Sequence, residues 1–208
     1  MSPRLRVATV GSLVIMGVVA WIVISQWPMD ALDDPVSRYA RWHAGHDAEV
    51  AKYRAFLNQH GVGTIVPMQQ LLQLGRRWRQ CGGEEFAVPP PQQWPQIVPT
   101  LRLLRDLGSQ GLIDNATVAS GFRSASYNRC EGGSSGSRHL TNQALDIDLP
   151  AILPDDADRL CAAWRKDGPR LGWGLGFYSP TEIHLDTAGF RTWGFDFHAG
   201  TSLCRAGR

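Results

Sequence analysis

The chain has 208 residues and a formal net charge of +2 at pH 7, which is enough sequence for one core of ordinary size and little for a second. Its basic residues form no long run and no stripe interleaved with aromatic side chains, so we expect no nucleic-acid partner. The four cysteines are widely spaced and contain no C-x-x-C pair, which argues against a thiolate zinc cage.

The N-terminal segment predicts export. Residues 7–24 are almost wholly apolar, about the length that a helix needs to cross a membrane. Arg4 and Arg6 precede this run and the aspartate-rich residues 30–34 follow it, so the positive-inside rule places the later chain outside the cytoplasm. We therefore predict a single-pass anchor in the inner membrane over residues 1–27, with a periplasmic C-terminal domain. A cleaved signal peptide is the alternative, disfavoured by the long apolar run and by the lack of a small-x-small cleavage site behind it.

After a juxtamembrane linker over residues 28–46, hydrophobic periodicity predicts helices first and short strands later, within one domain over residues 47–208. This order indicates an α+β fold. The predicted helices are 47–60, 67–80, 96–107 and 154–167, and the predicted strands are 117–119, 144–149 and 183–186.

The cysteines bear on the compartment as well. Their even number allows two disulfides in an oxidising environment, in any of three pairings, and the sequence does not choose among them. The cysteines are Cys81, Cys130, Cys161 and Cys204.

Three residues form the candidate chemical centre: His139, Asp146 and His184. His139 ends a loop rich in glycine and serine, and Asp146 follows in a predicted strand whose alternation places Asp146 and Asp148 on one face. Two imidazoles and a carboxylate are a ligand set of catalytic zinc, which keeps a fourth position for water.

Several short segments surround these three residues in the chain. In order they are Ser120-Gly121-Phe122-Arg123-Ser124, Tyr127-Asn128, Gly132-Gly133, Ser137-Arg138-His139, Ala144-Leu145-Asp146-Ile147, residues 172–176 with Tyr178, and Ile183-His184-Leu185-Asp186 with Arg191 and Trp193. These segments resemble the M15 group of zinc D-Ala-D-Ala peptidases, which carries the patterns S-G-[YF]-R-S, a Gly-Gly loop, S-x-H-x6-D, G-x-G-x-Y and [VI]-H-x-D followed by R-x-W. The resemblance covers residues 95–195, in the same order, and residues 1–80 lie outside it.

The resemblance implies one zinc ion per chain, held by His139, Asp146 and His184. It also implies that Arg123 holds a substrate or transition-state oxygen, and that Ser137 and Tyr178 assist in binding substrate. The fold expected from it is a small antiparallel sheet flanked by helices, with the metal on the open face. The zinc core then covers residues 95–195 and a helical part covers residues 47–94.

One position departs from the family pattern. Many members place a general base, Glu or Asp, three residues before the last histidine, where this chain has Thr181. Glu182 and Asp186 flank His184 instead, and on a strand all three side chains share one face. Either carboxylate could be the base, and the alternative role of Asp186 is to orient the imidazole of His184.

The function implied is hydrolysis of an amide in peptidoglycan stem peptides, by a carboxypeptidase or a cross-link endopeptidase. Two alternatives remain: a zinc-containing module that binds peptidoglycan or a partner without cleaving it, and a peptidase for another exported substrate.

Overall fold

The computed structural model describes residues 34–205. These residues fall into two compact units, and the boundary in the sequence is between Gly45 and His46. The first contains α2 (Pro35–His43), capped by the Asp34 carboxylate, which accepts from the amides of Val36 and Ser37. The sequence showed no period there. The predicted anchor lies outside the described residues, and within 34–205 no helix combines the length and apolarity that a membrane crossing needs.

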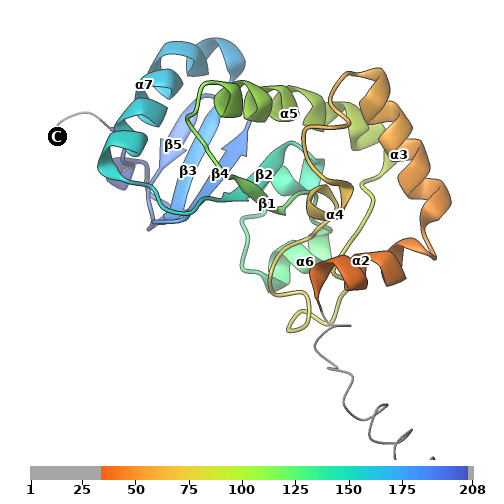
Figure 1. Ribbon diagram of the computed structural model, residues 1–208. Coiled ribbons are helices and arrows are strands. Elements are labelled where there is room, and N and C mark those ends of the chain that lie inside the picture. The colour runs from red at the N-terminus through yellow and green to blue at the C-terminus, as the bar shows by residue number, and fades with distance from the viewer. Residues whose placement is uncertain (1–33, 206–208) are drawn as a thin grey trace, which may run out of the picture. The chain divides into compact units, whose positions relative to one another are not determined.

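The second unit places helices around one five-stranded sheet (Figure 1), which confirms the α+β class. Its helices are α3 (Asp47–Gln59), α4 (Met68–Leu71), α5 (Trp94–Ser109), α6 (Ala125–Cys130) and α7 (Pro154–Leu171), with 3₁₀ turns at Pro91–Gln93, Arg138–Thr141 and Ala199–Thr201. Its strands are β1 (Thr117–Ser120), β2 (Ala144–Asp148), β3 (Gly174–Ser179), β4 (Glu182–Asp186) and β5 (Arg191–Trp193).

The strand order is β1-β2-β4-β3-β5, and all neighbours are antiparallel except β3 and β5, which run parallel. The expectation of a purely antiparallel sheet is therefore wrong at this edge. The reason lies in the connection after β4, which ends where β3 begins, with Asp186 opposite Gly174. Strand β5 then begins on the opposite edge of β3, beside the same residue, since Arg191 also pairs with Gly174. Both strands therefore start at the same end of the sheet, and β5 runs parallel to β3.

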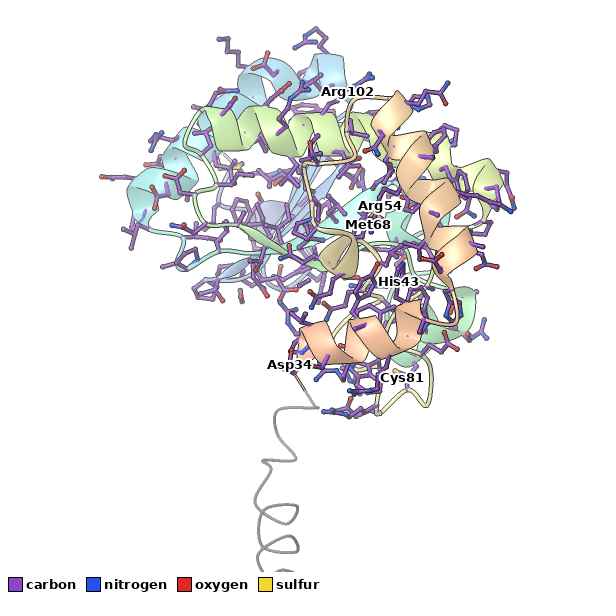
Figure 2. The ribbon with its side chains drawn as sticks, turned by 45° about the vertical axis from the view of Figure 1, so that its right-hand side comes forward. Asp34, His43, Arg54, Met68, Cys81 and Arg102 are labelled. Atoms are coloured by element: carbon purple, nitrogen blue, oxygen red, sulfur yellow. A yellow bond between two sulfur atoms is a disulfide. The ribbon has the colours of Figure 1, made fainter. Side chains whose placement is uncertain are left out.

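Alternation along the strands separates an apolar face from a polar one. The apolar residues are fully buried: Leu145 and Ile147 of β2, Leu175 and Phe177 of β3, and Ile183 and Leu185 of β4. Helices α5 and α7 lie against the sheet (Figure 1), with Ile97, Leu101, Leu160 and Trp164 among their buried residues. Helix α3 packs beside α5, the helix that carries Arg102 (Figure 2). The Arg102 guanidinium donates to the carbonyl of His60, which follows α3, at 3.3 Å. This packing leaves the polar face free to carry a site.

Two predicted helices have different lengths in the structure. The helix predicted over 67–80 stops at Leu71, because the amide of Leu74 instead donates to the carbonyl of Glu85 and that of Ala87 to Leu72. The helix predicted over 154–167 continues to Leu171 and ends at Gly172, whose φ of 62° is the left-handed conformation of a helix C-terminus.

The structure also resolves the three possible cysteine pairings. Cys81 pairs with Cys130, and Cys161 pairs with Cys204. The first bridge joins the loop after α4 to the end of α6, and the second joins α7 to the C-terminal segment. Since disulfides persist in oxidising compartments, the two bridges indicate an extracytoplasmic domain.

Candidate metal centre

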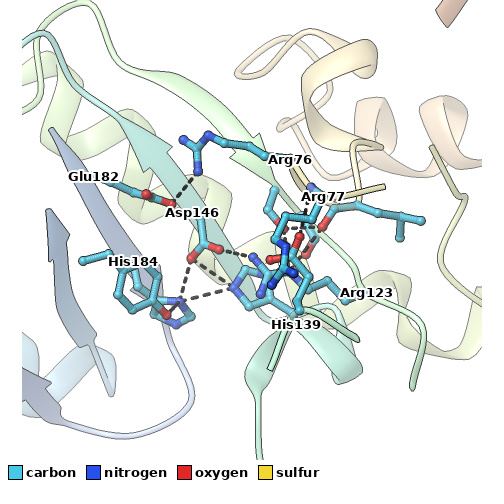
Figure 3. A network of polar contacts seen from close by, with 12 residues as sticks. Arg76, Arg77, Arg123, His139, Asp146, Glu182 and His184 are labelled. Carbon is cyan, nitrogen blue, oxygen red and sulfur yellow. Dashed lines mark hydrogen bonds and ion pairs between the residues drawn. The ribbon is translucent and has the colours of Figure 1, made fainter. Parts of the chain in front are cut away.

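The fold brings His139, Asp146 and His184 together on the polar face of the sheet (Figure 3). Asp146 of β2 is directly opposite His184 of β4, so their side chains emerge side by side. His139 comes from the 3₁₀ turn just before β2. Three distances describe the cluster: 3.1 Å from His139 Nε2 to Asp146 Oδ1, 3.0 Å from His184 Nδ1 to Asp146 Oδ1, and 3.3 Å between the two imidazole nitrogens. All three residues are buried.

Neighbouring groups determine which imidazole nitrogen carries hydrogen. His139 Nδ1 lies 2.6 Å from the Gly121 carbonyl, which only accepts, so Nδ1–H donates there and Nε2 turns its lone pair to the cluster. His184 Nε2 lies 2.9 Å from Asp186 Oδ2, and donation to that carboxylate leaves the lone pair of Nδ1 facing the cluster. Two imidazole nitrogens and a carboxylate oxygen therefore converge on one point, and both nitrogens present lone pairs there when His184 Nδ1 is deprotonated, as a metal ligand must be.

Charge at the cluster favours a cation. Burial opposes ionisation of the Asp146 carboxyl, yet His139, His184 and Arg123 hold its pKa well below the ordinary value. Burial also lowers the pKa of His139, which favours its neutral form. For His184 the hydrogen bonds to Asp146 and Asp186 outweigh burial and raise its pKa, which favours a proton on Nδ1 beside Asp146. A metal ion bound to Nδ1 and Asp146 would take the place of that proton and balance the carboxylate charge.

The geometry fits a tetrahedral ion. Ligand atoms about 2.0–2.1 Å from a tetrahedral metal lie roughly 3.3 Å apart, close to the separations found here. The cluster also opens on one side into a cleft of about 730 Å³, lined by Asp146 and His184. Three protein ligands and an open side are the arrangement of catalytic zinc rather than of a closed structural site.

Arg123 supports the cluster from β1's side of the sheet. Its Nη2 donates to Asp146 Oδ2, and its Nε donates to Ser120 Oγ at 2.8 Å (Figure 3). This leaves Asp146 Oδ1 directed at the two histidines. Arg123 also lines the cleft, so the substrate contact implied by the family resemblance stays a prediction alongside the observed one with Asp146.

The two candidate bases lie in different surroundings. Asp186 is completely buried behind His184, on the side away from the cluster, and Arg191 Nη2 donates to it at 2.6 Å. Its contact with His184 Nε2 is the one that the alternative role, orienting the imidazole, would need, and that role stays a prediction. Glu182 instead lines the cleft and accepts from Arg76 Nη1 at 2.8 Å (Figure 3). Of the two carboxylates, Glu182 is the one that lines the cleft.

Ser137 and Tyr178 both line the cleft, as a substrate-binding role requires. The Tyr178 hydroxyl lies 3.1 Å from His184 Nδ1, at the edge of the cluster. Burial raises its pKa, so this phenol stays protonated and able to donate.

The glycines of the G-x-G-x-Y segment make room for the site. Gly176 is opposite His184, and a Cβ there would lie 2.2 Å from the Trp193 indole. Gly174 is opposite Asp186, and a Cβ there would lie 2.4 Å from its carboxylate. These spacings explain why the polar face of β3 carries no side chain at these two positions.

Sequence reasoning missed one wall of the cleft, formed by Arg76 and Arg77 on the loop after α4. Arg76 pairs with both Asp148 and Glu182, and the amide of Arg77 donates to Glu131 at 3.1 Å. Because residues 67–80 were predicted to be helical, no loop was expected here. Arg76 and Arg77 also belong to none of the family motifs. The clue was Cys81, whose bond to Cys130 ties the loop to the site.

Comparison with known proteins identifies a family. A family model described as Peptidase M15 matches residues 77–186, slightly more than half of the chain. The matched span contains all three members of the cluster together with Glu182 and Asp186. No curated protein and no solved structure matches.

Proposed function

This chain belongs to the peptidase M15 family, and from that premise we propose that it is a zinc-dependent peptidase that hydrolyses an amide bond in peptidoglycan peptides. The observation that carries the proposal is the convergence of two imidazole lone pairs and one carboxylate oxygen at the base of an open cleft. We further propose that a membrane anchor over residues 1–27 holds the domain outside the cytoplasm.

Each residue has a distinct task in the proposed reaction. His139, Asp146 and His184 would hold one zinc ion, which supplies an acidified water and polarises the scissile carbonyl. Glu182 accepts the proton of the attacking water and returns it to the leaving amine. Asp186 keeps the lone pair of His184 Nδ1 directed at the metal position.

Arg123 and Tyr178 act on the substrate oxygen in this proposal. Both line the cleft, and both lie within hydrogen-bonding distance of a cluster residue. A permanently charged guanidinium and a protonated phenol are suited to stabilising the negative charge that develops on the carbonyl oxygen.

The test is mass spectrometry of purified muropeptides incubated with the full-length chain in detergent, with and without a chelator. Loss of one alanine would identify a carboxypeptidase, and splitting of cross-linked dimers would identify an endopeptidase. In both cases the chelator is expected to abolish the product.

A second candidate is a zinc-containing module that binds peptidoglycan peptides without cleaving them. The ion pair between Arg76 and Glu182 favours it, because the pairing occupies the carboxylate that the peptidase would need free to accept a proton. Unchanged muropeptides, from a folded chain that carries zinc and binds them, would establish this candidate in place of the peptidase.

The two disulfides provide a matched test of how the cleft wall is held. Replacing either cysteine pair with serine is expected to lower the free energy of unfolding by about 2–4 kcal/mol, since the bridged segments are similar in length. Only loss of Cys81–Cys130 should also lower kcat/KM, because it frees the loop that carries Arg76. Thermal unfolding and muropeptide turnover of both double variants check this, and equal activity in the two would show that the wall does not need its bridge.

A further inference from the structure

An aromatic wall runs from the metal centre to the rim of the cleft, formed by Tyr178, Trp193 and Phe197. The Tyr178 and Trp193 rings lie 5.8 and 5.1 Å from the imidazole of His184, measured between centroids. The Phe197 ring lies 5.7 Å from the Tyr178 ring. The three rings thus form one aromatic cluster beside His184.

Phe197 is the most exposed large apolar side chain of residues 34–205, at 73%. Its backbone has φ = 64°, a left-handed conformation that bulky residues rarely adopt. The short loop that contains it is well bonded: Asp196 accepts from the amide of His198 at 2.9 Å, and Gly194 accepts from the amide of Phe197 at 2.9 Å.

The backbone conformation of Phe197 belongs to this turn, in which the Gly194 amide also donates to the His198 carbonyl at 3.0 Å. The turn does not account for the exposure of the side chain. A cluster of apolar rings that is partly open to water beside a cleft indicates a contact for a ligand. Phe195, two residues earlier, is 48% exposed but does not line the cleft. The loop therefore directs one of its two phenylalanines at the cleft.

The chemistry of the wall indicates a sugar ring. The Tyr178 ring is tilted by 46° to that of Trp193 and by 52° to that of Phe197. Tyr178 and Trp193 are half-buried and Phe197 is exposed, so the rings offer a shallow surface rather than an enclosed pocket for an alkyl group. A pyranose presents an apolar face of C–H groups that can lie on an aromatic ring, while its hydroxyls remain solvated at the edge. Such an amphipathic partner suits rings that are only partly withdrawn from water.

The ring distances limit how far Phe197 lies from the reacting bond. The His184 and Tyr178 rings are 5.8 Å apart, and the Tyr178 and Phe197 rings are 5.7 Å apart, so the two distances together are an upper limit on the separation of Phe197 from His184. An extended peptide covers that limit in roughly three residues, at about 3.3–3.6 Å for each. A group carried a few residues from the scissile amide is therefore within reach of Phe197.

We propose that Phe197, with Tyr178 and Trp193, forms a subsite for the sugar that carries the stem peptide, so that the enzyme prefers glycan-attached peptides over free ones. This rests on the proposed function. Binding energy gained at a remote sugar is expected to raise kcat/KM for the longer substrate.

The test compares two substrates with the same peptide: the disaccharide muropeptide, and the free peptide left after its sugar is removed. The wild-type chain is expected to favour the muropeptide by about tenfold in kcat/KM, and Phe197→Ala to reduce that preference to about one. Alanine keeps a Cβ at the same φ, so the backbone conformation costs the variant what it costs the wild type. Phe195→Ala is the matched control, and Phe197→Tyr should restore the preference.

Each outcome decides the proposal. Equal turnover of the two substrates by the wild type, or an equal loss on both in Phe197→Ala, would overturn the sugar subsite while leaving the peptidase intact. If neither substrate is cleaved, the proposed function fails, and calorimetric binding of the same two ligands decides the subsite separately. Tighter binding of the muropeptide that depends on Phe197 supports it, and equal binding overturns it.

Discussion

His184→Ala is expected to remove zinc binding and amide hydrolysis together. The substitution deletes one of the three proposed metal ligands and leaves only Asp146 and His139 to hold the ion. Turnover should fall by about 10³-fold or more, because the metal contributes several kcal/mol of charge stabilisation in the transition state. Zinc content by elemental analysis and muropeptide turnover check both effects, and His139→Ala should behave alike.

The fold should survive these substitutions. Asp186 keeps Arg191 as a partner when the imidazole is lost, and the apolar face of the sheet is untouched. Circular dichroism and thermal unfolding verify this, and His60→Ala, an exposed histidine at the end of α3, is the matched control. An active double variant lacking both His139 and His184 would refute the proposed mechanism.

Glu182→Gln and Asp186→Asn are expected to separate the proton-transferring carboxylate from the positioning one. Loss of the general base should lower kcat by about 10²–10⁴-fold with zinc content unchanged. Asp186→Asn should instead weaken zinc binding by about 10–100-fold, because the amide holds the imidazole of His184 less firmly. Added zinc should then restore much of the activity of Asp186→Asn and none of that of Glu182→Gln.

The measurements are kcat and KM at several zinc concentrations, together with a zinc dissociation constant for each variant. The reverse result, in which Asp186→Asn binds zinc normally and loses kcat, would assign the base to Asp186. That outcome would require His184 to move, because the Asp186 carboxylate now lies on the far side of its ring.

The sequence by itself was sufficient for the family, the α+β class and the three members of the cluster. Zinc ligands come from a few residue types, and their neighbours recur in ordered motifs, so these residues are recognisable without coordinates. Local periodicity also placed α3 and α5 to within a few residues, since each has an apolar face that packs on the domain core.

Tertiary structure decided the features that depend on contacts between distant segments. The pairing of Cys81 with Cys130 is one, and the parallel course of β5 beside β3 is another. The short helix α4 is a third, because backbone bonds to residues 85 and 87 outweigh local helical preference. The two carboxylates beside His184 look equivalent along the strand. They differ because Arg191 and the imidazole enclose Asp186, while Arg76, more than 100 residues away in sequence, holds Glu182 at the cleft.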